Sequence, residues 1–128
     1  MIRASFGPEL GGLTVFGVHM IRFPHSRAQY RQAAALSKLI DTTPGRKVVM
    51  GDFNATPFSR ITRTIAQQTG LRLLTELPTW PSRLELPQMA IDHIFASPGI
   101  RVTEGQSIGN GAGSDHYPVT LKLAVPLN

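Results

Sequence analysis

The sequence predicts an α/β fold with one β-sheet and about two helices, in a single domain over residues 1–128. Three features predict this class. Segments rich in β-branched and aromatic residues occur near both ends of the chain, two stretches carry apolar residues at helical spacing, and a short apolar strand, Val48-Val49-Met50, lies between these stretches. A chain of 128 residues is long enough to bury one core but short for two.

The first two predicted strands form a hairpin. They cover residues 2–6 and 13–19, and the Gly- and Pro-containing segment between them has the composition of a hairpin loop. Ser26 can cap the helix that follows, which we expect to end near Ile40 because Thr42-Thr43-Pro44-Gly45 stops it. The chain therefore opens with a strand pair and a first helix.

A short strand over residues 47–51 comes next, and Asp52-Phe53-Asn54 follows it directly. Its continuous apolar run is typical of a strand that is buried on both faces. We expect a second helix over about residues 59–68, ended by Gly70. Apolar residues recur there at helical spacing, namely Phe58, Ile61 and Ile65.

The last third of the chain is predicted to be mainly β-structure. Residues 74–89 are rich in Pro and are expected to be irregular. Three strands follow, over 91–96, about 101–108 and 118–124. The Gly-rich stretch 109–113 joins the last two strands.

Charge and composition limit the possible functions. Lys and Arg number 13 against 8 Asp and Glu, a net charge of +5, which fits either an anionic partner such as nucleic acid or a basic surface without a partner. The absence of Cys excludes disulfides, zinc–thiolate sites and thiol nucleophiles. No apolar run is as long as a membrane span, while the compartment stays open and a membrane-tethered longer parent is one alternative.

Asp52 and Asn54 are the first candidate pair for chemistry. A strand's period of two places their side chains on one side and Phe53 on the other, and Gly51 permits a close approach. A carboxylate can orient or deprotonate an attacking water, and an amide N–H can bond to a developing oxyanion. The alternative is an Asx turn after the strand, without catalysis.

Asp92 and His116 are the second candidate pair. In the strand over residues 91–96, alternation places Asp92 opposite His93, and a carboxylate among β-branched neighbours needs a partner. We expect Asp92 to orient the imidazole of His116, which comes from the loop before the last strand. Asp115, next to His116, can bind a hard cation through oxygen. His93 is interpreted as a surface residue.

His19 is a third candidate because it ends the apolar strand over residues 13–19. A histidine in this position either caps the edge of the sheet or contacts a phosphate group, and the residues alone do not decide between the two.

These elements occur in one order along the chain. They are the strand that ends in His19, Gly51-Asp52-Phe53-Asn54, Ile91-Asp92-His93-Ile94-Phe95 and Ser114-Asp115-His116-Tyr117-Pro118. The set resembles the endonuclease/exonuclease/phosphatase superfamily, whose members include pancreatic-type deoxyribonucleases, abasic-site endonucleases, inositol polyphosphate phosphatases and neutral sphingomyelinases. The resemblance covers residues 13–123, and Thr79-Trp80-Pro81 looks like the family's substrate-side loop.

The resemblance implies a role for each candidate residue. Asp52 would align the nucleophilic water and, with Asp115, hold Mg²⁺ or Mn²⁺. Trp80 would contact the substrate. The remaining implied roles are phosphate binding by His116, orientation of His116 by Asp92, stabilisation of the pentacoordinate phosphorus by Asn54, and a phosphate or leaving-group contact from His19.

The resemblance also implies that the chain is half of a four-layer α/β sandwich. This half would be one mixed, mostly antiparallel β-sheet with about two helices on its outer face. Members of the family are much longer, and their amino-terminal half supplies an Asn and the principal metal-binding Glu. We therefore expect residues 1–128 to be the carboxy-terminal half, with little or no activity alone. The missing half, or a second copy of this chain, would cover the inner face of the sheet.

The implied activity of the parent protein is divalent-metal-dependent hydrolysis of phosphodiester or phosphomonoester bonds. The alternative is a non-catalytic module that keeps the motifs and dimerises or binds an anionic partner. Nucleases, lipid phosphatases and sphingomyelinases share these motifs, so the substrate is open. The positive charge slightly favours nucleic acid over lipid or inositol phosphate.

Overall fold

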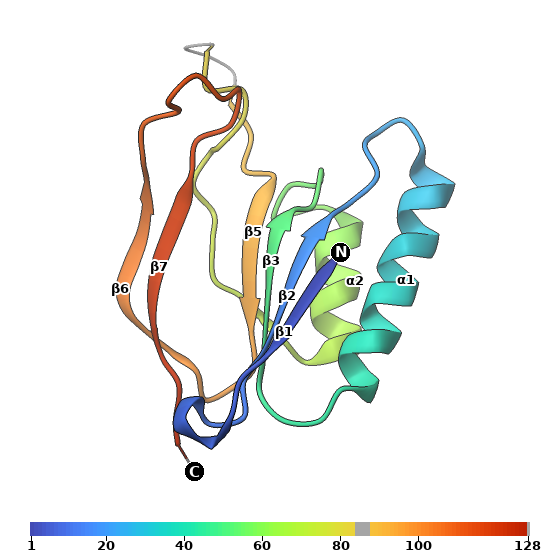
Figure 1. The fold of residues 1–128 in the computed structure, drawn as a ribbon. Coiled ribbons are helices and arrows are strands. Elements are labelled where there is room, and N and C mark those ends of the chain that lie inside the picture. Colours follow the sequence, from blue (N-terminus) through green and yellow to red (C-terminus); the bar gives the residue numbers. More distant parts are fainter. Residues whose placement is uncertain (84–87, 128) are drawn as a thin grey trace.

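The structure is a computed structural model that describes residues 1–83 and 88–127, and it has an α/β architecture (Figure 1). Within these residues the main sheet has the strand order β1-β2-β3-β5-β4. β2 and β3 are parallel, while the other neighbouring strands are antiparallel, so the predicted mixed sheet is confirmed. The strands are β1 (Ile2–Ser5), β2 (Thr14–His19), β3 (Lys47–Asp52), β4 (Arg72–Leu73) and β5 (Asp92–Ala96).

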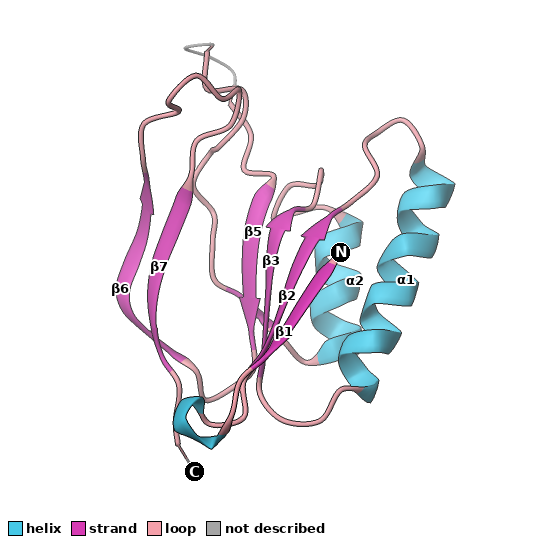
Figure 2. Cartoon of the chain, in the orientation of Figure 1, coloured by secondary structure: helices cyan, strands magenta, loops and turns pink. Residues whose placement is uncertain are grey.

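Helices α1 (Ser26–Thr42) and α2 (Arg60–Thr69) cover one face of the main sheet (Figure 2), and a short 3-10 helix, η1 (Pro8–Leu10), lies in the hairpin loop. Side chains from both layers form the larger core cluster, among them Phe16, Val49, Phe95, Leu36 and Ile65. Burial of each such side chain stabilises the folded state by about 1.5–3 kcal/mol. This burial fixes the helices against the strands.

The helix ends follow the predicted signals with two differences. The Ser59 hydroxyl accepts a hydrogen bond from the Thr62 N–H at 3.2 Å, and Gly70 ends α2 in the left-handed conformation with φ of 67°. Ser26 is the first residue of α1 and does not cap it, since His25 occupies the N-cap position. Phe58 precedes α2 and is 85% exposed, so it is not part of the core.

The last two strands, β6 (Arg101–Ile108) and β7 (Val119–Ala124), pair with each other in a separate two-stranded sheet. The sequence did not predict this separation from the main sheet. The chain turns after β5, where buried Ile100 donates its N–H to the Ser97 carbonyl oxygen, and β6 begins at the next residue. The β6–β7 hairpin lies on the side opposite the helices (Figure 1).

A smaller core cluster joins the hairpin to the main sheet. Leu123 of β7 packs against a group of buried residues, Val48, Ala96 and Ile100. Cover on this inner face is partial, since Met50 in the centre of the sheet is 46% exposed. β6 is exposed along almost its whole length.

The segment before β5 is largely irregular, as predicted for residues 74–89, apart from a bridge between Trp80 and Met89. Residues 84–87 of that prediction lie outside the described residues. In the described part of the chain, none of the helices has the length and apolar character needed to cross a bilayer.

Candidate active site

Three candidate side chains lie side by side across the main sheet. In the strand register His19 of β2 is opposite Asp52 of β3, and Asp52 is opposite Asp92 of β5. Because side chains opposite one another share a face, all three point away from the helices. The register therefore brings together residues that are up to 73 positions apart in the sequence, counting from His19 to Asp92.

Gly51 permits this close register. Its φ is 140°, and a Cβ added there would meet the carbonyl oxygen of Val18 at 1.9 Å. Only glycine accommodates both the backbone conformation and the neighbouring strand. Asp52, the next residue, is thereby placed directly beside His19.

The Asp52 carboxylate is held by Asn54. Asp52 Oδ1 accepts a hydrogen bond from the Asn54 backbone N–H at 2.7 Å, which is the Asx turn considered as the alternative for this motif. The Asn54 side-chain amide donates to the Met20 carbonyl oxygen at 2.9 Å and, over a longer distance of 3.3 Å, to Asp52 Oδ2. The turn thus fixes the carboxylate in the pocket. The Asx turn is present, and the catalytic role of Asp52 and Asn54 stays a prediction.

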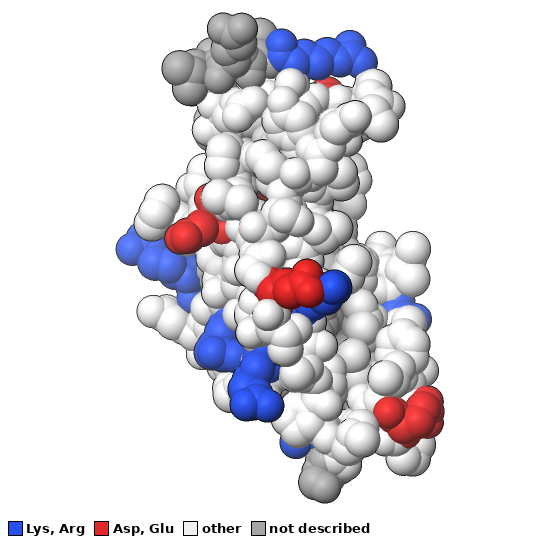
Figure 3. Space-filling model, turned by 90° about the vertical axis from the view of Figure 1, so that its left-hand side faces the viewer, with Lys and Arg blue, Asp and Glu red and all other residues white. Residues whose placement is uncertain are grey.

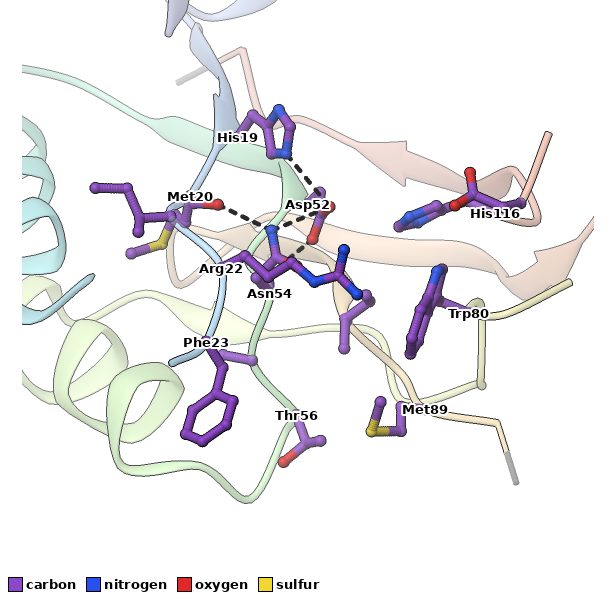
Figure 4. A pocket seen from close by; sticks show the side chains of 14 residues that line it. His19, Met20, Arg22, Phe23, Asp52, Asn54, Thr56, Trp80, Met89 and His116 are labelled. Atoms are coloured by element: carbon purple, nitrogen blue, oxygen red, sulfur yellow. Dashed lines mark hydrogen bonds and ion pairs between the residues drawn. The ribbon is translucent and has the colours of Figure 1, made fainter. Parts of the chain in front are cut away.

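The expected contact between Asp92 and His116 is present. His116 Nδ1 lies 2.8 Å from Asp92 Oδ2, and the same oxygen accepts a hydrogen bond from the Thr79 hydroxyl at 2.6 Å. A carboxylate oxygen accepts, so Nδ1 carries the proton and Nε2 of His116 is the ring nitrogen left available to a ligand. Figure 4 shows the imidazole facing the Asp52 side of the pocket.

The His19 side chain, at the end of β2, is largely exposed to solvent. Its side chain is 80% exposed, and Nε2 lies 3.6 Å from Asp52 Oδ2, longer than a hydrogen bond. The histidine therefore faces the pocket entrance with a ring that is free to contact a ligand.

Burial raises the pKa of Asp52 above its usual value of 3.8, the hydrogen bond from Asn54 opposes this rise, and the charge of Asp92 adds to it. Two carboxylates face each other across β3 and β5, where like charges are destabilising. A cation between them would remove this repulsion.

These residues line one pocket of about 860 Å³ (Figure 4). Trp80 forms part of its wall, and Asp115, which is exposed, lies at its edge. All of the site residues predicted from the sequence border this pocket except Asp92, which contacts His116 and, with it, lines a second pocket. Arg22 also lines the pocket, which the sequence did not indicate.

The donor set fits a divalent cation. One ligand atom from each of Asp52, Asp92 and His116 lies within 4.8 Å of the others. Carboxylate oxygens suit Mg²⁺ and Mn²⁺, which complete their coordination with water and substrate oxygens. The sequence predicted Asp52 and Asp115 as metal ligands, but in the described residues Asp92, not Asp115, converges on Asp52.

His93 lies inside the molecule, so its interpretation as a surface residue was wrong. It is 1% exposed, its Nε2 lies 2.7 Å from the Ala55 carbonyl oxygen, and its Nδ1 lies 3.2 Å from the Thr75 hydroxyl. Burial lowers the pKa of His93 below its usual value of 6.5, and the hydrogen bond to Ala55 opposes the change. The ring sits on the helix side of β5 next to Phe53, where it fixes the loop after β3.

Thr79 is a site residue that sequence reasoning missed. It is completely buried, its hydroxyl contacts Asp92, and its carbonyl oxygen accepts a hydrogen bond from the Tyr117 N–H at 2.9 Å. Thr79 thereby connects the loop before β5 with the loop that carries His116. Its place beside Trp80 in the sequence was the available signal.

In this fold, carboxylates and imidazoles gather at neighbouring strand ends. A site of this class is suited to metal ions and phosphoryl groups. Residues 2–116 match the profile of the Endonuclease/Exonuclease/phosphatase family, and the chain belongs to this family. The resemblance inferred from the sequence is thus confirmed. A search of curated proteins finds no match.

Solved structures share the fold at low sequence identity. A functionally unknown conserved protein from Enterococcus faecalis is 18% identical, with a TM-score of 0.72 over 89% of this chain and 50% of that chain. The mannosyl-6-phosphatase from Bacteroides thetaiotaomicron is 19% identical, with a TM-score of 0.62 over 88% and 51%. A beta-toxin variant from Staphylococcus aureus with bound magnesium ions is 14% identical, with a TM-score of 0.60 over 85% and 52%. The chain spans about half the length of these structures.

Proposed function

We propose that the chain supplies one part of the active site of a divalent-metal-dependent phosphoesterase, which hydrolyses phosphodiester or phosphomonoester bonds. The observation that carries the proposal is the convergence of His19, Asp52 and His116 on one pocket, with Asp92 behind His116. Acidic oxygens for a cation and imidazoles for an anion then lie within one site.

His116 binds a phosphoryl oxygen in this proposal. Asp92 accepts a hydrogen bond from Nδ1–H and stabilises a positive charge on the ring, so that Nε2, when protonated, can donate to the phosphate. Thr79 holds the Asp92 carboxylate in the orientation that this contact requires. His19, at the exposed end of β2, contacts the phosphate or the leaving group.

Asp52 orients the attacking water. One of its oxygens is engaged by the Asn54 N–H, and the other has only the long contact with the Asn54 amide and faces His19. A carboxylate that is fixed by a turn is pre-organised to accept a proton from water. The Asn54 amide stabilises the phosphorus centre once it exchanges its 3.3 Å contact with Asp52 for a phosphoryl oxygen.

A divalent cation would be held by Asp52 and Asp92, with Asp115 at the pocket edge as a further oxygen ligand. When bound, such an ion offsets the charge of the phosphoryl group and lowers the pKa of a coordinated water. Mg²⁺ or Mn²⁺ fits these oxygen donors, and one relative of similar fold contains magnesium ions.

A further part of the site would come from outside this chain. The match to half of each relative's length supports this, and so does the β6–β7 hairpin, whose outer edges lack a strand partner among the described residues. A two-stranded sheet is marginally stable by itself. Figure 3 shows large areas without charged side chains on the hairpin side of the molecule. An amino-terminal half, or a second copy of this chain, would cover this side.

The substrate in this proposal is a phosphate ester, and the net charge of +5 slightly favours nucleic acid over lipid or inositol phosphate. The relatives of similar fold include a mannosyl-6-phosphatase, so sugar phosphates belong among the test substrates.

The test is hydrolysis of bis(p-nitrophenyl) phosphate, of plasmid DNA and of a sugar phosphate, mannose 6-phosphate, with Mg²⁺ or Mn²⁺. Asp52→Ala and His116→Ala are compared with the matched controls Asp41→Ala and His25→Ala, which change exposed residues outside the pocket. We expect metal-dependent turnover that is lost in the first pair and kept in the second.

Turnover that survives in both Asp52→Ala and His116→Ala would contradict the proposal. If the chain has no turnover, the same variants are made in the longest reading frame that contains it. Metal-dependent turnover there, lost in both variants, supports the proposal, and its absence, together with phosphate binding, favours the anion-binding module.

A further inference from the structure

The positively charged guanidinium of Arg22 lies in the pocket and has no anionic partner among the described residues. Its guanidinium carbon lies 5.5 Å from the centre of the Trp80 ring. Among the described residues, the guanidinium has no ion pair or hydrogen bond, although Asp52 and Asp115 line the same pocket. Figure 4 shows the Arg22 side chain between Asn54 and Trp80.

The backbone on the amino-terminal side of Arg22 is firmly anchored. The Met20 N–H donates to the Asp52 carbonyl oxygen at 2.8 Å, and the Ile21 N–H donates to Gln32 Oε1 at 2.7 Å. The carbonyl oxygen of Arg22 itself accepts a hydrogen bond from the His25 N–H at 3.2 Å. The guanidinium therefore projects from a fixed point of the segment between β2 and α1.

Trp80 is anchored from the opposite side of the pocket. It exchanges two backbone hydrogen bonds with Met89, at 3.0 and 2.6 Å. The ring thus provides a fixed surface on which the guanidinium rests through a cation–π contact.

This arrangement selects the charge of the ligand. A guanidinium has five N–H donors in one plane and binds phosphate oxygens in pairs, and stacking on a ring leaves these donors free at its edge. A quaternary ammonium would instead need an open aromatic face, and here Arg22 already covers a face of Trp80. The part of the pocket wall formed by Arg22 and Trp80 is therefore suited to an anion rather than to a quaternary ammonium.

We propose that Arg22, stacked on Trp80, binds a second anionic group of the substrate, beside the phosphoester that lies at Asp52 and His116. The site then prefers phosphoesters with a second phosphate within reach, and it discriminates against phosphocholine esters. This inference rests on the proposed function for the position of the first phosphate. The second phosphate belongs either to the next nucleotide of a nucleic acid or to a small doubly phosphorylated molecule.

Binding can be measured through Trp80, the single tryptophan of the chain. Inorganic pyrophosphate and phosphocholine are titrated into the chain, with and without Mg²⁺, while tryptophan fluorescence is recorded. The variant is Arg22→Gln, and the matched control is Arg27→Gln, an exposed position on α1 that does not line the pocket.

We expect pyrophosphate to bind at least about tenfold more weakly to Arg22→Gln than to the parent chain, because one charge-assisted contact is lost. Arg27→Gln should bind like the parent chain, and phosphocholine should bind more weakly than pyrophosphate. Equal pyrophosphate affinity in Arg22→Gln and Arg27→Gln, or phosphocholine affinity equal to that of pyrophosphate, would overturn the inference.

The measurement separates this inference from the proposed function because it does not depend on turnover. Arg22-dependent pyrophosphate binding in a protein that hydrolyses no phosphoester would keep the anion site and reject the proposed function. Metal-dependent hydrolysis with unchanged pyrophosphate affinity in Arg22→Gln would do the opposite. A short oligothymidylate that competes at lower concentration than pyrophosphate identifies nucleic acid as the source of the second phosphate.

Discussion

Thr79→Val should disturb the site without touching any residue proposed to contact substrate. Thr79 is completely buried, and its hydroxyl donates to Asp92 Oδ2 at 2.6 Å. Valine has nearly the same shape but no donor. The Asp92 carboxylate then keeps His116 as its donor and loses the hydrogen bond that fixes its orientation.

The magnitude follows from the nature of the lost bond. A hydrogen bond to a charged group contributes about 1.5–3 kcal/mol, and the partly buried carboxylate that is left behind cannot recover all of it from water. The Ile91 N–H, which lies 3.4 Å from the same hydroxyl, loses a weak partner as well. With a urea m-value of about 1.5 kcal/mol/M, the unfolding midpoint should fall by about 1–2 M.

Urea unfolding followed by Trp80 fluorescence measures this change, and Thr79→Ser is the matched control. Serine keeps the hydroxyl and loses one methyl group, which costs about 1 kcal/mol. The midpoint should therefore decrease from the parent chain to Thr79→Ser and further to Thr79→Val. If valine is tolerated better than serine, methyl packing rather than the bond to Asp92 keeps Thr79 in place, and the argument fails.

Three other predictions concern the backbone, pH and metal. Gly51→Ala should lower the free energy of unfolding by about 2 kcal/mol or more, because its Cβ would meet a carbonyl oxygen at 1.9 Å, whereas Gly105→Ala, with open space around it, should not. Burial lowers the pKa of His93, so the unfolded state takes up a proton before the folded state does as the pH drops. The contribution of His93 to the free energy of unfolding is therefore complete above pH 6.5 and is lost as the pH falls through the folded-state pKa. The pH dependence of thermal unfolding should be weaker in His93→Gln than in the parent chain and unchanged in His25→Gln. Mn²⁺ should raise the unfolding temperature of the parent chain but not of Asp92→Asn.

Motif order predicted the family and most of the polar residues that gather in the pocket. Because side-chain direction alternates along a strand, the separation of Asp92 from His93 could be read from the sequence, and an acid that needs a partner pointed to His116. The Asx turn at Asp52 was also predictable, since Asp before a loop commonly bonds to the N–H two residues later.

Other features depended on tertiary contacts that no local pattern encodes. His93 is buried because the carbonyl oxygen of Ala55 and the hydroxyl of Thr75 happen to satisfy both ring nitrogens, and these partners come from distant segments. The segment where β6 separates from the main sheet contains Ile100, which is completely buried but looks like any other apolar residue in the sequence. Arg22 reached the pocket for a similar reason, since its neighbour Trp80 comes from a different loop.

The placement of Asp52 opposite Asp92 connects the fold to the proposed chemistry. A sheet gains nothing from two carboxylates in cross-strand register, and their burial and mutual charge disfavour ionisation of Asp52. The surrounding donors, Asn54 for one carboxylate and Thr79 with His116 for the other, reduce this cost at each residue separately. The charges of His116 and His19 also act to lower the pKa of Asp52, and a divalent cation between the two carboxylates would reduce their repulsion further. In the proposed phosphoesterase, a bound divalent ion would make this pairing of acids favourable, which would give the fold a reason to keep both of them.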